Sequence, residues 1–143
     1  MPSLPRRLGT TGAVMALAAS GLLFGTASPA SAATSCYGAG CTGLNPANTI
    51  CANDARTIDT TFTNVELRYS PTCRAAWARR IGGINGGTDT VWVENSNGQS
   101  YSVDVPSNAS GTYYTLMVND KDLTSRACDN LGNPDTHVCS TWY

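Results

Sequence analysis

The sequence predicts a small, mostly β domain of the α+β class. In it, disulfides hold a twisted antiparallel sheet or partly open barrel of about four to six short strands with one short helix. Three observations support this prediction. All six cysteines lie between residues 36 and 139, and only 17 of the 111 residues from 33 to 143 are Leu, Ile, Val or Phe. Several runs also alternate apolar with polar side chains, which is typical of half-buried strands.

The first 32 residues have the pattern of a secretory signal peptide. Arg6 and Arg7 precede an uncharged stretch that is interrupted by glycines, and an Ala-Ser-Ala sequence ends at Ala32. The apolar part is shorter than the roughly 20 residues that a membrane span needs. We therefore expect cleavage after Ala32, secretion without a stable membrane anchor, and a single disulfide-rich extracellular domain over residues 33–143. Both the general and the twin-arginine export routes stay open.

The charge of the chain excludes one class of partner. Nine Lys and Arg residues stand against ten Asp and Glu residues, and they are spread along the chain. This distribution contains neither a polybasic arm nor an acidic tail, so we expect no nucleic-acid partner. The sequence also indicates no cofactor.

Six cysteines in a small exported chain predict three disulfides. A zinc site is the alternative, but the chain has no C-x-x-C pair and His137 is its only histidine, so we expect no metal. We expect Cys128 to pair with Cys139, because the residues between them are rich in turn formers. The other four cysteines are then expected to pair among themselves, in an order that the sequence does not determine. They are Cys36, Cys41, Cys51 and Cys73.

The amino-terminal half of the predicted domain combines a loop region with a strand. Residues 36–56 are rich in glycine and cysteine, which indicates a compact cross-linked loop region. A strand is predicted over residues 65–69, where apolar and charged side chains alternate. Its odd-numbered residues are expected to face the core, and Glu66 and Arg68 are expected to face solvent.

A short helix is predicted over residues 71–80. Ser70 and Pro71 resemble an N-cap followed by proline at the first helical position. Positions 73, 77 and 81 lie four apart on one helix face, which places Trp77 in the core. The three arginines at positions 74, 79 and 80 could contact cell-wall phosphates from this helix, but we expect them to form a solvated face.

The clearest local pattern predicts a β-hairpin over residues 91–105. We expect a three-residue loop with Gly98 in the left-handed conformation. This register pairs Val91 with Val103 and places the apolar residues of both strands on one face. Trp92 then points away from these valines.

Two further strands are predicted near the carboxyl terminus. Residues 113–118 form a run of aromatic and apolar side chains, and residues 123–128 are expected to form an edge strand. Between them, Asp120 and Asp122 alternate as calcium ligands would. This segment lacks the glycine and the distal glutamate of an EF-hand loop, so we expect a plain turn.

Two segments resemble an actinobacterial family of exported proteins that is described only as a domain of unknown function. The first is CYGAGCTG at residues 36–43, followed by Asn-Pro at 45–46, Cys51 and Asp-Ala at 54–55. The second is ELRYSPTCRAAWAR at residues 66–79. The resemblance covers most of residues 36–128. It implies an extracytoplasmic module, in some members the outer part of a membrane-anchored regulator, and it assigns no catalytic residues.

The sequence offers one catalytic hypothesis, a small nuclease-like secreted hydrolase. Glu66 and Arg68 share a strand face, where Glu66 would act as the base and Arg68 as a phosphate clamp. His137 would complete this site as the proton donor. However, two-residue alternation by itself produces a solvated ion pair of Glu66 and Arg68. A lone histidine beside a disulfide cysteine is also typical of a surface loop. The sequence therefore favours a protein that is not an enzyme.

Aromatic side chains give the leading function hypothesis. Trp92, Tyr113, Trp142 and Tyr143 are expected to be exposed, and exposed aromatic side chains stack on sugar rings or anchor partner proteins. We therefore predict a non-catalytic exported module that binds a partner protein or a cell-envelope polymer. The alternative for these aromatics is that they cover a thin core from its second side. A secreted protease inhibitor with the Gly-rich loop 82–88 is a further functional alternative.

We expect excess dithiothreitol to unfold the domain. Three disulfides at roughly 2–4 kcal/mol each match the whole stability of about 5–15 kcal/mol expected for a domain of this size. Far-UV circular dichroism measures the outcome, and an unchanged spectrum in excess reductant would contradict this expectation.

Overall fold

The computed structural model describes residues 32–143, so the predicted signal peptide, apart from Ala32, lies outside the described residues. This part of the chain is mostly β, as predicted, and its helical segments are three short 3-10 turns: η1 (Gly38–Cys41), η2 (Pro46–Asn48) and η3 (Ile50–Asn53). No helix within it is long and apolar enough to cross a membrane. The strands are β1 (Arg56–Thr60), β2 (Val65–Ser70), β3 (Ala75–Ile81), β4 (Asp89–Asn95), β5 (Ser100–Val105), β6 (Thr112–Tyr114), β7 (Val118–Asn119), β8 (Ser125–Asp129) and β9 (Val138–Cys139).

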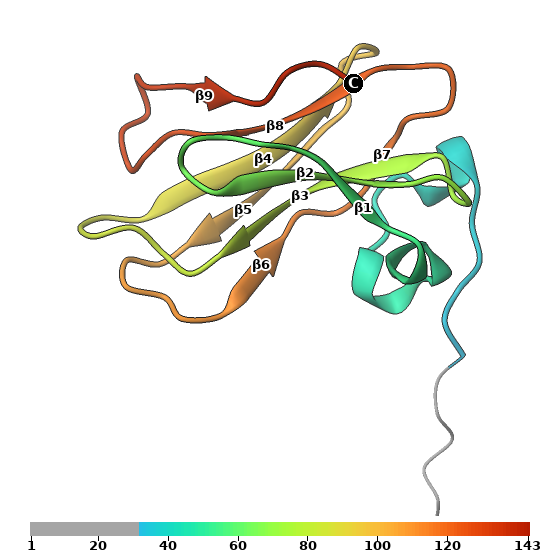
Figure 1. Cartoon of the computed structure of the whole chain (residues 1–143), viewed down its shortest axis with the longest axis horizontal. Coiled ribbons are helices and arrows are strands. Elements are labelled where there is room, and N and C mark those ends of the chain that lie inside the picture. The colour runs from blue at the N-terminus through green and yellow to red at the C-terminus, as the bar shows by residue number, and fades with distance from the viewer. Residues whose placement is uncertain (1–31) are drawn as a thin grey trace, which may run out of the picture. The chain divides into compact units, whose positions relative to one another are not determined.

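The strands form two antiparallel sheets that pack face to face (Figure 1). The first sheet has the order β1-β2-β3-β6, and β7 also pairs with β3. The second sheet has the order β5-β4-β8-β9. Inward side chains of both sheets share one buried cluster, which is the main core. Its members include Val65, Leu67, Ala78, Val91, Val93, Val105 and Ala127. The described residues thus hold nine strands, more than the sequence predicts.

The strand over residues 65–69 and the hairpin over residues 91–105 are confirmed. In β2 the odd-numbered residues are buried, while Glu66 and Arg68 are partly exposed. In the β4–β5 hairpin, Val91 lies opposite Val103, as predicted. Gly98 has a φ of 80°, the left-handed conformation that the three-residue loop requires. Turn geometry therefore fixes which face of this hairpin is buried.

The helix predicted over residues 71–80 is wrong, because this segment forms a tight turn and then strand β3. The Cys73 N–H does donate to Ser70 Oγ over 3.1 Å, as it would to an N-cap. However, Arg74 adopts a φ of 50°, and the chain then reverses to pair with β2. Residues four apart also share a face on a strand, because four is a multiple of the two-residue strand period. The spacing of residues 73, 77 and 81 therefore does not separate the two conformations.

Two expectations for the carboxyl-terminal third are also corrected. The strand predicted over residues 113–118 is interrupted between β6 and β7. There the Met117 N–H donates to the Leu44 carbonyl over 3.0 Å, and the Gly43 N–H donates to the Met117 carbonyl over 2.9 Å. The chain thus leaves β3 and pairs with the amino-terminal loop. The edge strand predicted over residues 123–128 is β8, which lies between β4 and β9 inside the second sheet.

The three disulfides confirm the predicted Cys128–Cys139 pair and the pairing among the four amino-terminal cysteines. The latter form the Cys36–Cys41 and Cys51–Cys73 bridges. Because Cys51 lies in η3 and Cys73 lies in the β2–β3 turn, the second bridge fastens the 3-10 turns to the first sheet. The turns cover part of its outer face, where a second buried cluster forms. This cluster consists of Cys41, Cys51, Cys73, Ala75, Trp77 and Met117.

A buried ion cluster links the two sheets and corrects the expectation that Arg80 is solvated. Arg80 points inward from β3 and is only 5% exposed. Its Nη1 donates to Asp129 Oδ2 over 2.8 Å and also to Asp89 Oδ2. Both aspartates are fully buried. Burial is the main cause that raises the pKa of Asp129; a hydrogen bond from Thr63 opposes the rise, and the Asp89 carboxylate adds to it.

We expect Arg80→Met to lower the free energy of unfolding by about 3–5 kcal/mol, because the substitution leaves two buried carboxylates without their cation. Urea denaturation measures the change. Arg126→Met is the matched control, since Arg126 forms a partly exposed ion pair with Glu94 at 2.5 Å. The control should lose only about 0–1 kcal/mol. Equal losses in the two variants would show that Arg80 does not have this structural role.

Asp120, directly after β7, is a buried carboxyl group. It is 4% exposed and accepts a 2.6 Å hydrogen bond from Ser125 Oγ. Burial raises the pKa of Asp120 to about 6, although the Ser125 hydrogen bond and the charge of Arg74 oppose the rise. The folded state therefore binds this proton more tightly than the unfolded chain does.

This raised pKa predicts a dependence of stability on pH. The contribution of Asp120 is fully present below the unfolded pKa of 3.8 and is lost as the pH rises through about 6. Between pH 4 and pH 7, the free energy of unfolding should fall by about 1–3 kcal/mol more in the wild-type protein than in Asp120→Asn. Denaturant titrations at several pH values test this expectation. Parallel pH profiles for the two proteins would refute it.

Candidate functional site

A pocket with a volume of about 150 Å³ opens on the outer face of the first sheet. Strands β2, β3 and β6 form one side of the pocket, and the η2 and η3 turns with the residues beside them form the other. Figure 1 shows these turns at one end of the first sheet, beside β1. The lining residues are Pro46, Ala47, Ala52, Ala55, Arg68, Trp77, Arg79 and Tyr114.

The register of three neighbouring strands brings the large side chains of the pocket together. Arg68 in β2 lies directly opposite Trp77 in β3, and Arg79 in β3 lies directly opposite Tyr114 in β6. Residues that lie opposite each other in a sheet share a face. Because Ala78 between them points into the main core, these four side chains point outward.

The η2 and η3 turns supply the apolar side of the pocket. Asn45 Oδ1 accepts a 2.9 Å hydrogen bond from the Ala47 N–H and so caps η2. The Cys51–Cys73 disulfide holds η3 against the β2–β3 turn. The position of this side therefore depends on a side-chain cap and a covalent bond, not only on apolar contacts.

Two arginines of the lining and Glu66 beside them set the charge at the pocket. Arg79 Nε donates to Glu66 Oε2 over 2.6 Å, and Arg68 Nη1 lies 4.0 Å from the same oxygen. Arg68 is held further by Thr57 Oγ1 at 2.6 Å and the Ala55 carbonyl at 2.9 Å. Burial, and after it the charge of Arg79, lowers the pKa of Arg68, but arginine stays protonated at neutral pH. This group of three ionised side chains therefore carries one positive charge in excess.

The chemistry of the pocket suits an anion attached to a ring. Guanidinium groups donate paired hydrogen bonds to carboxylates and phosphates. The Arg79 side chain is 28% exposed and Tyr114 is 37% exposed, so a ligand can reach both. Trp77 is almost fully buried, so little of its surface is accessible in the lining. The combination provides charge recognition beside aromatic and aliphatic surface.

Glu66, Arg68 and His137 do not come together in the structure. Glu66 and Arg68 lie on the outer face of the first sheet. His137 lies in the loop before β9, and its ring contacts Trp92 edge to face with the ring centres 5.2 Å apart. Trp92 alternates with the buried valines of β4, so it points to the outer face of the second sheet. The core of the two sheets therefore separates His137 from the other two residues.

None of the four aromatics predicted to bind a partner lines the pocket. Trp92 and Tyr113 are half-buried, and Tyr113 packs against the main core. Trp142 and Tyr143 are 45% and 50% exposed. The Arg126 guanidinium lies 4.5 Å from the centre of the Trp142 ring. Trp142 and Tyr143 thus present an aromatic surface beside β8, away from the pocket lining.

The sequence singled out two pocket residues for a function, Arg68 as a phosphate clamp and Arg79 in a basic run that could contact cell-wall phosphates. The predicted helix over residues 71–80 places Trp77 in the core and Arg79 on a solvated face. It therefore misses the pairing of both residues with β2. The signal that points to the correct conformation is a period of two, since alanines at 76 and 78 alternate with larger side chains at 77 and 79. Tyr114 enters the pocket only through its pairing with β3.

Within residues 32–143, the cluster of side chains whose spacing could hold a metal ion is formed by the four amino-terminal cysteines. Their sulfur atoms are joined in two disulfides, whereas a metal ion would bind these cysteines as free thiolates. Asp120 and Asp122 contact different partners and do not share a site. Asp120 is buried beside Ser125, and Asp122 forms an exposed ion pair with Lys121 at 2.7 Å.

Comparison with known proteins identifies a family. No curated protein and no solved structure matches this chain. A family model described as a protein of unknown function (DUF2690) matches residues 39–128. The matched segment contains every residue that lines the pocket and four of the six cysteines. The chain therefore belongs to the DUF2690 family of proteins of unknown function.

Proposed function

We propose that this protein is an exported, non-catalytic module that binds an anionic polymer of the cell envelope through the pocket between the first sheet and the η2–η3 turns. The observation that carries the proposal is the excess positive charge of Arg68 and Arg79 over Glu66, next to Tyr114. Export is supported by the signal-peptide pattern of residues 1–32 and by three disulfides, which form and persist in oxidising compartments.

The size of the pocket favours a group that projects from a polymer. Pockets for small-molecule ligands usually measure roughly 300–1,000 Å³. A volume of about 150 Å³ instead accommodates one carboxylate or phosphate and part of the ring that bears it. A polymer with many such groups compensates for weak single contacts by binding at several points.

The geometry also supports binding without catalysis. Acid–base catalysis needs a donor and an acceptor within hydrogen-bond reach of one substrate. Glu66 is not a lining residue of the pocket, and its carboxylate is engaged by Arg79 at 2.6 Å and by Thr57 at 3.3 Å. His137, the histidine of the catalytic hypothesis, lies on the second sheet. The described part of the chain therefore offers a charged recognition site with no paired proton donor and acceptor in it.

Binding to immobilised polymers tests the proposal. We expect the wild-type protein to be retained on polygalacturonate or on a polyglycerol phosphate, but not on neutral dextran. Arg68→Gln and Arg79→Gln should each weaken binding about tenfold, which corresponds to the loss of about 1.4 kcal/mol of charge-assisted contact. Retention should also fall as the salt concentration rises. Comparing the two anionic columns distinguishes carboxylate from phosphate recognition.

Two control variants show whether the pocket is the site. Arg126→Gln removes from the second sheet an arginine about as exposed as Arg79, and Trp142→Ala removes its aromatic neighbour. Both variants should bind as the wild type does. Weaker binding in these controls with unchanged binding in Arg68→Gln would move the site to the carboxyl-terminal aromatics. Absence of wild-type binding to every anionic polymer would contradict the proposal itself.

A further inference from the structure

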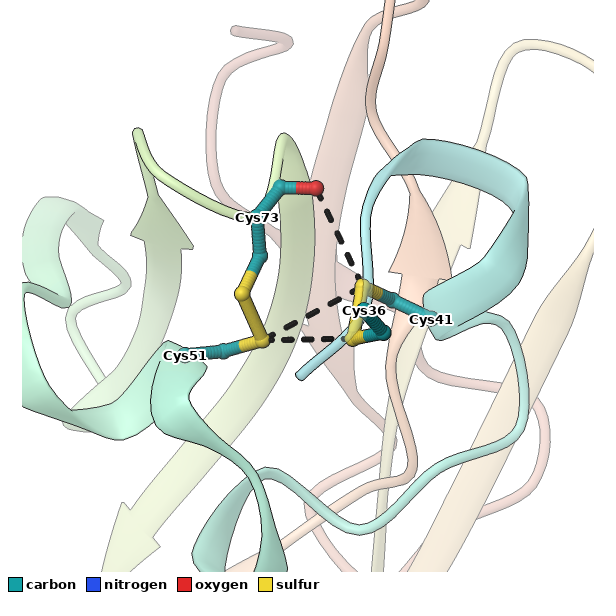
Figure 2. A group of neighbouring side chains, drawn as sticks. All are labelled: Cys36, Cys41, Cys51 and Cys73. Atoms are coloured by element: carbon teal, nitrogen blue, oxygen red, sulfur yellow. Dashed lines mark hydrogen bonds between the residues drawn. A yellow bond between two sulfur atoms is a disulfide. The ribbon is translucent and has the colours of Figure 1, made fainter. Parts of the chain in front are cut away.

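The two amino-terminal disulfides are in contact with each other (Figure 2). Cys36 Sγ lies 3.4 Å from Cys51 Sγ, and Cys41 Sγ lies 4.0 Å from the same atom. All four sulfur atoms lie within 4.8 Å of one another. We propose that this cluster is an intramolecular thiol–disulfide exchange site, in which reduction of Cys36–Cys41 is passed on to Cys51–Cys73.

The exposure of the four cysteines indicates where the reaction starts. Cys36 is partly exposed, whereas Cys41, Cys51 and Cys73 have no exposed surface. An external thiolate therefore reaches Cys36 Sγ first, because access governs the rate of thiol–disulfide exchange. The Cys36–Cys41 bridge also joins residues only five positions apart, so its loss removes less loop-closure stabilisation than the loss of Cys51–Cys73, which joins residues 22 apart.

The first stage is an ordinary exchange with an external dithiol. One thiolate of the dithiol attacks Cys36 Sγ, the Cys36–Cys41 bond breaks, and Cys41 leaves as a thiolate. The second thiolate of the dithiol then attacks the dithiol sulfur that is bonded to Cys36. This closes the dithiol into a ring and releases Cys36 as a thiolate. The dithiol has been oxidised to a cyclic disulfide, and the protein has gained two electrons.

The second stage needs no further reagent. The Cys36 thiolate attacks Cys51 Sγ, which lies 3.4 Å away in the oxidised structure. A Cys36–Cys51 bond forms and the Cys51–Cys73 bond breaks. The electron pair of the broken bond stays on Cys73 Sγ, which takes a proton from solvent. The protein keeps the same number of disulfides, but the pair of thiols has moved from Cys36 and Cys41 to Cys41 and Cys73.

The third disulfide provides an internal comparison. Cys128–Cys139 joins β8 to β9 in the second sheet and does not belong to the four-sulfur cluster. A thiol created at Cys128 therefore has no second disulfide within reach in the folded domain. Exchange between bridges should be confined to the amino-terminal cluster.

Limited reduction of the folded wild-type protein tests the proposal. The protein is treated with one equivalent of dithiothreitol, quenched in acid, denatured, alkylated with N-ethylmaleimide, digested and mapped by mass spectrometry. We expect a peptide pair linked through Cys36 and Cys51, together with alkylation of Cys41 and Cys73. Alkylation confined to Cys36 and Cys41, with Cys51–Cys73 intact, would overturn the proposal.

A variant makes the same test without a reductant. Cys41→Ser leaves Cys36 as a permanent thiol beside Cys51–Cys73, so alkylation after an acid quench and denaturation should shift from Cys36 to Cys73. The matched control Cys139→Ser leaves Cys128 as the thiol, and alkylation should remain on Cys128. If Cys41→Ser that was folded before the quench is alkylated on Cys36 alone, the exchange does not occur. If Cys41→Ser does not fold, limited reduction of the wild type decides the question.

Discussion

The Cys51–Cys73 disulfide is the constraint on which the proposed recognition site depends. It joins η3 to the β2–β3 turn, and both sulfur-bearing residues are fully buried. The 3-10 turns have few large aliphatic side chains with which to adhere to the outer face of the first sheet. A covalent bond therefore supplies the fixed position that a larger second core would otherwise supply. The pocket lies where this cover ends, because there the outward side chains of β2, β3 and β6 become accessible.

The same cover explains which strands could be predicted from the sequence. In β2 and in the β4–β5 hairpin, one face is buried in the core and the other is partly solvated, so polarity alternates along the chain. In β3, the main core buries Ala76 and Ala78, and the second cluster buries Ala75 and Trp77. A strand buried on both faces shows no alternation of polarity. The four-residue spacing of positions 73, 77 and 81 fits a helix equally well, and only the alternation of small and large side chains at 76–79 points to a strand.

The site was less predictable than the fold because it is assembled from distant segments. Arg68 and Arg79 are visible as charged residues in the sequence, whereas their relation to each other and to Tyr114 depends on the pairing of β3 with both β2 and β6. The disulfides show the same limit. Turn-forming residues between Cys128 and Cys139 identify one pair, but the order within the other four depends on how the 3-10 turns fold back. That path is set by hydrogen bonds between loops, such as those of Met117, which local sequence patterns do not encode.

Burial of Asp120 makes folding of this domain a proton-uptake reaction near pH 6. In the folded protein the pKa of this carboxyl is about 6, while in the unfolded chain it is fully ionised at that pH. Each molecule that folds therefore removes a fraction of a proton from the buffer. The heat of folding measured by calorimetry in this range includes the ionisation enthalpy of the buffer, so it will differ between phosphate and imidazole solutions of the same pH.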